Sequence, residues 1–266
     1  SQNMPRGFHP WVAATFGAEL GAAVLAFALT WSASGYGPEL AATVLTLTIA
    51  PSVAFGLLGG AVADRFGPRR VMIAGTLALI VISSILMFAV FMWGAHPATL
   101  LVVAVLIGTV SAFYRPAAGV FPRLFVPDAL LGTAMARVGM AGQFARTIGP
   151  PLGGLLIGLI TLGGVAALDA VGGLIMLLTL TLIHPPLERA GGGDNVTLRS
   201  IARGLSTAGK TSGVPALLAC VGIVAGAVIP AVLLGIPLAA RERGWTAAQA
   251  GVIEAGWIAG GLAAGA

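Results

Sequence analysis

GAVADRFGPRR, residues 60–70, is a short charged stretch between two long apolar runs. It carries one aspartate and three arginines, whereas residues 40–63 and 71–93 carry no charged side chain. A helix needs about 20 apolar residues to cross the hydrocarbon of a bilayer, and both runs are long enough. The stretch therefore predicts a tight turn that joins two membrane spans and keeps both helix ends on one side of the membrane.

The composition of the whole chain supports this interpretation. Of the 266 residues, 58% are hydrophobic and only 9% are charged, against about 25% charged residues in a soluble domain. So few charges cannot cover a water-facing surface. We therefore expect most of the surface of this protein to face the lipid bilayer. The net charge of +5 comes from basic residues scattered between apolar runs. They form no basic patch of the kind that binds nucleic acid, so we expect no nucleic-acid partner.

Apolar runs of spanning length recur along the chain and predict an all-α polytopic membrane protein with eight spans. They lie at residues 11–33, 40–63, 71–93, 98–121, 132–160, 163–183, 214–239 and 247–266. The last run stops at Ala266 without a flanking polar anchor. We therefore expect the chain to be cut off inside or just after a helix.

The basic residues predict which connections face the cytoplasm. Eleven fall in connections of one parity, against two, Arg241 and Arg243, in the other. The eleven are Arg6, Arg65, Arg69, Arg70, Arg115, Arg123, Arg137, Arg189, Arg199, Arg203 and Lys210. Because cytoplasmic connections of membrane proteins are enriched in Lys and Arg, we expect the N-terminus, the 64–70 turn, the 122–131 loop and the 184–212 segment to be cytoplasmic.

Residues 184–212 form the only long connection on the predicted cytoplasmic side. They contain a Pro pair and three consecutive glycines, which interrupt helices. We interpret the segment as a linker between residues 1–183, a six-helix bundle, and residues 213–266, the first two helices of a second bundle. The alternative is an ordinary loop in an eight-span protein.

Three motifs resemble the major facilitator superfamily. The first resembles its signature loop between helices 2 and 3, and is formed by Gly60, Asp64, Arg65, Gly67, Arg69 and Arg70. The second, Arg115 with Gly119, resembles the fourth-span motif of its drug antiporters, although Pro116 and Ala118 depart from the usual pattern. The third resembles the antiporter motif of the fifth span, and is formed by Gly149, Pro150, Gly153 and Gly154. Residues 121–127, followed by residues 149–156, resemble the corresponding stretches of the bacterial branch that holds macrolide and siderophore exporters.

The resemblance implies a twelve-helix fold in two bundles, of which this chain holds about the first eight helices. It implies a monomeric secondary transporter in the bacterial cytoplasmic membrane, not an enzyme, and without a cofactor. The expected activity is proton-coupled efflux of small amphipathic organic compounds of the drug or siderophore type. An uptake symporter or a lipid transporter of the same fold is the alternative. Because alternating access needs two halves, residues 1–266 alone are expected not to transport.

The resemblance also implies roles for the motifs. Asp64 would latch against a helix of the second half when the cytoplasmic side is closed, although the neighbouring arginines also serve as plain positive-inside anchors. The prolines and glycines of residues 149–154 favour a kinked, thin helix that moves against the opposing half. Static packing of small residues is the alternative for this cluster.

Five ionisable residues fall within the predicted spans. They are Glu19, Arg115, Arg146, Asp169 and Glu254. A charge at the centre of a bilayer costs about 2.5–3.5 kcal/mol or more, so such residues are functional candidates. Glu19, Arg146, Asp169 and Glu254 are the candidates for proton coupling, while Arg115 lies near the cytoplasmic end. The three histidines show no metal-ligand spacing, and no metal site is expected.

Glu19 is the favoured proton-binding group. It is the carboxylate closest to mid-membrane in the first half, and in the fold that the chain resembles its helix neighbours the helix of Arg146. A structural ion pair is the alternative role for these two residues. On this interpretation Glu19→Gln abolishes proton-driven export, and Asp169→Asn has a milder effect.

Residues 204–211 match the phosphate-binding pattern G-x-x-x-x-G-K-[ST]. That loop binds phosphates only between a buried strand and the N-terminus of a helix. Here the preceding residues are predicted to form an interfacial helix, and the following ones enter a membrane span. A nucleotide-driven membrane protein is therefore an unfavoured second function, which a nucleotide-binding measurement on purified protein would test.

The charge asymmetry yields a labelling prediction. In a variant without Cys220, a cysteine introduced by Gly192→Cys is expected to be protected from an impermeant thiol reagent added to intact cells. Labelling from outside would reverse the assigned orientation.

Overall fold

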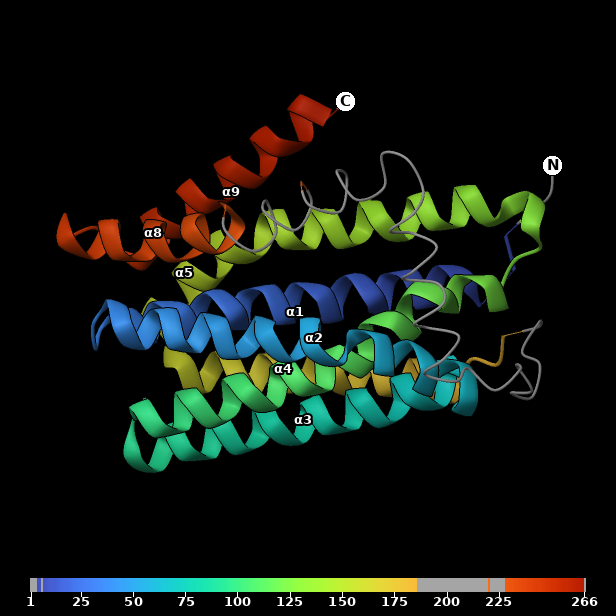
Figure 1. Cartoon of the computed structure of the whole chain (residues 1–266), viewed down its shortest axis with the longest axis horizontal. Helices are drawn as coiled ribbons and strands as arrows, with labels where there is room; N and C mark the ends of the chain where they lie inside the picture. Colours follow the sequence, from blue (N-terminus) through green and yellow to red (C-terminus); the bar gives the residue numbers. More distant parts are fainter. Residues whose placement is uncertain (1–3, 6, 186–219, 221–227, 266) are drawn as a thin grey trace.

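The computed structural model describes residues 4, 5, 7–185, 220 and 228–265 (Figure 1). Every regular element in these residues is a helix. The elements are α1 (Phe8–Ser34), α2 (Pro38–Phe66), α3 (Pro68–Trp93), α4 (Pro97–Val120), the 3₁₀ helix η1 (Phe121–Leu124), α5 (Asp128–Leu182), α8 (Ile229–Glu242) and α9 (Ala247–Gly265). The predicted all-α membrane class is therefore confirmed.

Five of the described helices are long and apolar enough to span a membrane. The fifth, α5, has 55 residues and non-helical dihedrals at Thr161. The chain reverses direction there, so α5 consists of two antiparallel limbs (Figure 1). This break falls between the predicted spans 132–160 and 163–183.

The connections lie at two opposite ends of the bundle. The start of α1, the α2–α3 turn and η1 lie at one end, which we call the N-terminal end (Figure 1). The α1–α2 and α3–α4 turns, the reversal within α5 and the α8–α9 turn lie at the other, which we call the distal end. This grouping matches the parity that the basic residues predict.

Two connections are shorter than expected. The charged turn is reduced to Gly67, because α2 continues through Phe66 and α3 begins at Pro68. A φ of 88° at Gly67 is readily adopted only by glycine, so a larger residue would not allow this direct reversal. The expected 122–131 loop is instead η1 followed by three residues, because α5 begins at Asp128.

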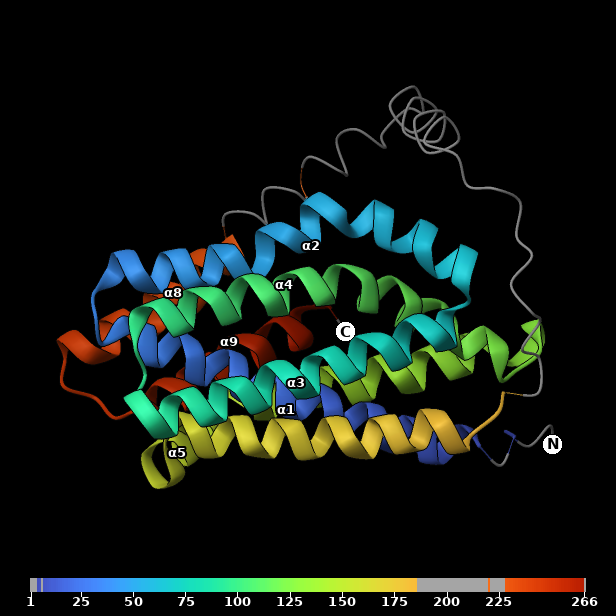
Figure 2. The same ribbon diagram turned by 90° about the horizontal axis from the view of Figure 1, so that it is seen from below.

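The bundle is organised around α1, which packs chiefly against α5, whereas α2 packs against α4 and α3 against both α4 and α5. α2 and α4 run side by side in both ribbon views (Figure 2). Apolar side chains of α1, α2, α3, α4 and α5 form one core cluster in the distal half. An aromatic cluster closes the N-terminal end, and contains Phe8, Trp11, Phe121 and Phe125.

The predicted linker, residues 184–212, lies outside the described residues apart from His184 and Pro185, so its role stays a prediction. Only part of the predicted seventh span is described, as α8. The eighth span corresponds to α9, which packs against α5 and α8. Before residues 186–219 the structure thus contains α1, α2, α3, α4 and the two limbs of α5, and after them α8 and α9. The division into two bundles stays a prediction.

The glycine-rich motif of α5 lies between α1 and α9. A methyl group added at Gly153 would come within 2.9 Å of the Val24 carbonyl oxygen of α1. Gly149 is as tightly packed against Ala23, and Gly154 against the backbone of α9 at Ala247. The small residues therefore bring α5 into backbone contact with a helix on each side.

This contact predicts that Gly153→Val destabilises the bundle by about 1–3 kcal/mol, because the added side chain overpacks the α1–α5 contact. Gly158→Val, in the same limb, is the matched control, because a Cβ at Gly158 meets nothing within 4 Å. Thermal unfolding of both variants in detergent measures the difference. Equal loss of stability in the two would contradict the assigned packing.

Candidate functional site

A cavity of ≈ 370 Å³ lies inside the first bundle, between α1, α2, α3, α4 and both limbs of α5. Most of its lining is apolar, with alanines, leucines and valines from all five helices. Four ionisable side chains that the sequence singled out line it, namely Glu19, Arg115, Arg146 and Asp169. Charged groups inside an apolar cavity can hold a ligand and respond to protons, so this cavity is the candidate site.

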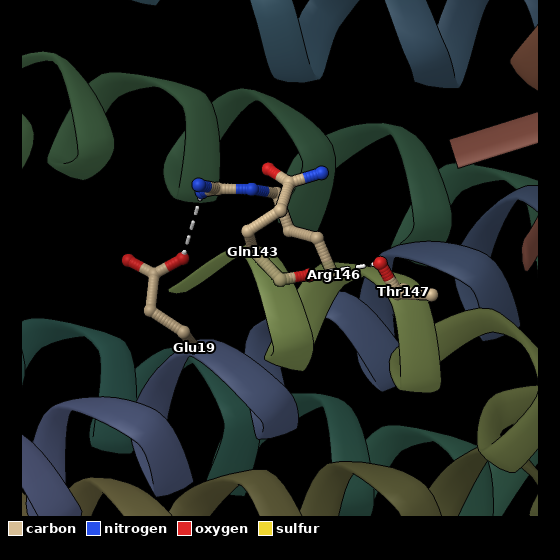
Figure 3. A network of polar contacts seen from close by, with 4 residues as sticks. All are labelled: Glu19, Gln143, Arg146 and Thr147. Atoms are coloured by element: carbon tan, nitrogen blue, oxygen red, sulfur yellow. Dashed lines mark hydrogen bonds and ion pairs between the residues drawn. The ribbon is translucent and has the colours of Figure 1, made fainter. Parts of the chain in front are cut away.

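The predicted neighbours Glu19 and Arg146 form an ion pair across the cavity. Nη1 of Arg146 donates to Oε2 of Glu19 at 3.3 Å, from the first limb of α5 to α1 (Figure 3). Their side chains are 33% and 49% exposed, so both carry some solvent contact. The pair joins α1 to the first limb of α5 by a polar contact on a mostly apolar wall.

Asp169 occupies a different part of the cavity wall. It projects from the second limb of α5, and its Oδ2 accepts a hydrogen bond of 2.6 Å from Ser83 Oγ of α3. Its Oδ1 lies against α1, where a Cβ at Gly21 would be 2.9 Å away. Asp169 thus has a hydroxyl partner, whereas Glu19 has an arginine.

Arg115 of α4 is exposed and lines the same cavity, and it makes no ion pair with any described residue. Gly119 also lines the cavity, and a Cβ there would meet nothing within 4 Å. The second motif therefore contributes a charge and open space to the wall near the N-terminal end. Its functional role stays a prediction.

Glu254 does not join the cavity group. It is buried in α9, 6% exposed, and is absent from the residues that line the cavity. Its helix packs on the opposite side of α5, near Pro150, where Gly251 makes backbone contact. A coupling role for Glu254 stays a prediction. Among the described residues, no His, Cys, Asp and Glu side chains are grouped closely enough to hold a metal ion.

The signature turn has a structural function that the sequence did not reveal. Arg69 donates from Nε to the Leu180 carbonyl at 2.9 Å and from Nη2 to the Thr181 carbonyl at 3.1 Å. These carbonyls belong to the last turn of α5, where no further intrahelical donor is available. Arg69 therefore caps the end of α5, and its charge complements the negative end of the helix dipole.

The remaining charges of the turn are on the surface. Asp64, Arg65 and Arg70 are exposed, and in the described part of the chain they make no ion pair. Gly60 faces open space. The latch role that the resemblance gives Asp64 stays a prediction.

Arg241, which the sequence placed among two exceptions to the charge asymmetry, joins α8 to α1 at the distal end. Its Nε donates to Ser34 Oγ and its Nη2 to the Trp31 carbonyl, both at 2.6 Å. Its guanidinium also lies 4.3 Å from the centroid of the Trp31 ring, a cation–π contact. A Cβ at Gly35 would be 3.3 Å from Nη2, so the missing side chain leaves room for this contact.

Comparison with known proteins agrees with this architecture. Residues 11–266 match the model of a family described as the Major Facilitator Superfamily. Macrolide efflux protein A of Streptococcus pyogenes is 23% identical over 175 residues, which are 65% of this chain and 43% of that protein. The protein of the same name from Enterococcus faecalis is also 23% identical, over 65% of this chain and 54% of that protein. The chain thus spans about half the length of the relatives that it matches.

A solved structure shows a similar fold. The crystal structure of a POT family transporter in complex with a thioalcohol-conjugated peptide superposes with a TM-score of 0.58 at 16% identity. The alignment covers 82% of this chain and 47% of that one. At this identity the likeness concerns the arrangement of helices.

The Arg241 contact predicts that Arg241→Gln separates α8 from α1 at the distal end. Glutamine retains neither the charge over the Trp31 ring nor the two-pronged donor geometry. Spin labels at the exposed positions Tyr36 and Glu242 are expected to show a longer, broader distance distribution. Arg243→Gln is the control, because Arg243 stacks only on Trp245 of its own α8–α9 connection. Identical distributions in the parent and Arg241→Gln would contradict the prediction.

Proposed function

Because the chain belongs to the Major Facilitator Superfamily, we propose that it acts in proton-coupled export of amphipathic organic compounds. Membership of this family supports membrane transport in general, and proton-coupled export is the more specific proposal. The single observation that supports the finer proposal is the 370 Å³ cavity, whose largely apolar wall holds a few ionisable groups. Such a lining suits ligands that are mostly apolar and carry a small number of polar atoms.

The similarity to macrolide efflux protein A favours export over import. A macrolide is a large, mostly apolar ring with polar substituents, and its chemistry suits a wall of this kind. We propose drug-type or siderophore-type compounds as substrates, and a bacterial cytoplasmic membrane with a cytoplasmic N-terminus as the location. An uptake symporter or a lipid transporter of the same fold is the second candidate. The nucleotide-binding pattern at 204–211 lies outside the described residues and supports no role here.

Movement in this proposal occurs at the face of α5 that meets α9. The two helices come into backbone contact at Gly154 and Gly251. A smooth small-residue interface lets one bundle rock against the other, as alternating access requires. At the distal end the Arg241 contact holds α8 on α1 in the observed arrangement. Release of that contact would accompany opening of the distal end.

The carboxylates of the cavity are the proposed proton-binding groups. Glu19 and Asp169 both line the space in which a substrate would sit, so the charge of either can influence substrate affinity. A group that binds a proton in one conformation and releases it in the other links substrate movement to the proton gradient. The protein is proposed to work as a monomer, with the bilayer, protons and small organic molecules as its partners.

Transport in everted membrane vesicles tests this function. Vesicles that carry the full-length transporter and an acidified lumen are expected to accumulate erythromycin, a macrolide, and ethidium, an amphipathic dye. The proton gradient drives substrate into the lumen in exchange for outgoing protons, so a protonophore should abolish accumulation. Accumulation only with the opposite gradient would favour symport. Accumulation that is indifferent to the gradient would refute proton coupling.

A further inference from the structure

Asp169 differs from the other cavity carboxylate in what surrounds it. Its only hydrogen bond among the described residues comes from Ser83, whose side chain is 1% exposed in the packing between α3 and α5. The sequence places Asp169 about a third of the way into its span, and the structure places it on the cavity wall. The signature turn does not involve this group.

The charged groups near this wall come from three elements. α1 contributes Glu19, α4 contributes Arg115, and the first limb of α5 contributes Arg146. Arg146 pairs with Glu19, and no described Lys or Arg nitrogen lies within ion-pair distance of Asp169. The polar side chains that α3 adds to the cavity wall are Thr76 and Ser83, and α4 also contributes the phenol of Tyr114.

Asp169 is half-buried and has no counter-ion among the described residues, so an ionised carboxylate there keeps only part of the hydration that open water would give it. One hydroxyl donor does not replace that hydration. A bound proton removes the charge, and a hydroxyl both donates to a carboxylate and accepts from a carboxylic acid. Ser83 can therefore partner Asp169 in both protonation states, whereas the guanidinium of Arg146 can only donate a hydrogen bond, and its charge attracts Glu19 only when that carboxyl is ionised.

We propose that Asp169, positioned by Ser83, is the proton-binding group of the transporter, and that the Glu19–Arg146 pair stays ionised. This inference rests on the proposed proton-coupled function and reverses the ranking that the sequence favoured. The step is a simple transfer: water in the cavity delivers a proton to a carboxylate oxygen of Asp169, and water returns it to the other side after the conformational change.

The position of Asp169 also links its charge to the position of α1. Oδ1 lies at the backbone of α1 beside Gly21, in a space too small for an added methyl group. Ionisation draws water to the carboxylate, and that water needs room between α1 and the second limb of α5. The distal end of the same helix holds the Arg241 contact to α8. A protonation change at Asp169 would thus affect the packing of α1, a helix that contacts both α5 and α8.

Infrared spectroscopy tests the assignment without a substrate. Full-length protein in lipid is titrated from acid to alkaline pH while the C=O stretching band of protonated carboxyl groups is followed. We expect a pH-dependent component of this band in the parent and in Glu19→Gln, and its loss in Asp169→Asn. Glu254→Gln identifies the separate contribution of the buried Glu254. An unchanged titration in Asp169→Asn would overturn the proposal.

A second measurement ties the group to coupling. In everted vesicles, Asp169→Asn is expected to lose the difference between erythromycin accumulation with and without a proton gradient, and Glu19→Gln to keep it. Ser83→Ala is expected to shift the pH dependence of accumulation. Glu39→Gln, at an exposed position outside the cavity, is the matched control. Loss of the gradient response in Glu19→Gln but not in Asp169→Asn would overturn the assignment.

The two proposals can fail separately. If the parent shows no gradient-driven accumulation, the proposed function fails, and the infrared titration still decides whether Asp169 binds the proton. If the parent is coupled and Asp169→Asn remains so, only the assignment to Asp169 fails.

Discussion

The cost of placing charge in hydrocarbon is the constraint on which the rest of this structure depends. A span can carry an ionised side chain only if a partner, a cavity or a helix end compensates for the lost water. The described ionisable groups show different forms of compensation. Arg146 forms an ion pair with Glu19, and Arg69 donates hydrogen bonds to the terminal carbonyls of α5. Asp169 accepts a hydrogen bond from the hydroxyl of Ser83 and lines the cavity. Of these three groups, Asp169 is the one with neither an opposite charge nor a helix end beside it.

Close backbone packing is the second constraint, and it occurs at two contacts to which we assign different roles. α2 and α4 approach so closely that a methyl group at Gly108 would lie 2.6 Å from the Leu47 carbonyl oxygen. That contact lies within the bundle and fixes its shape. The contact of α5 with α9 uses the same small residues but joins the bundle to a helix beyond it. Close packing of small residues thus holds α2 against α4, and in the proposed function the same kind of packing allows α5 to slide along α9.

Much of the fold could be predicted because its signals are local. Apolar run length and the charge of each connection depend on neighbouring residues, and they located α1, α2, α3, α4 and both limbs of α5. The Glu19–Arg146 pair required the family resemblance, because it joins residues 127 positions apart. The Arg69 cap and the Arg241 contact could not be predicted, since a surface arginine in sequence looks the same whether it anchors a helix to lipid or binds a distant carbonyl. The relation of Asp169 to Ser83 escaped prediction for the same reason.

The Arg69 cap also bears on the order of assembly. It joins the first turn of the third helix to the last turn of α5, 111 residues later in the chain. During synthesis, the carbonyls that accept these hydrogen bonds are not yet present when the first turn of α3 is inserted. Until the intervening spans are inserted, water or lipid headgroups can solvate the guanidinium at the membrane surface. The six-helix unit therefore closes only after its last limb has emerged, and the residue that closes it is already in place near the start.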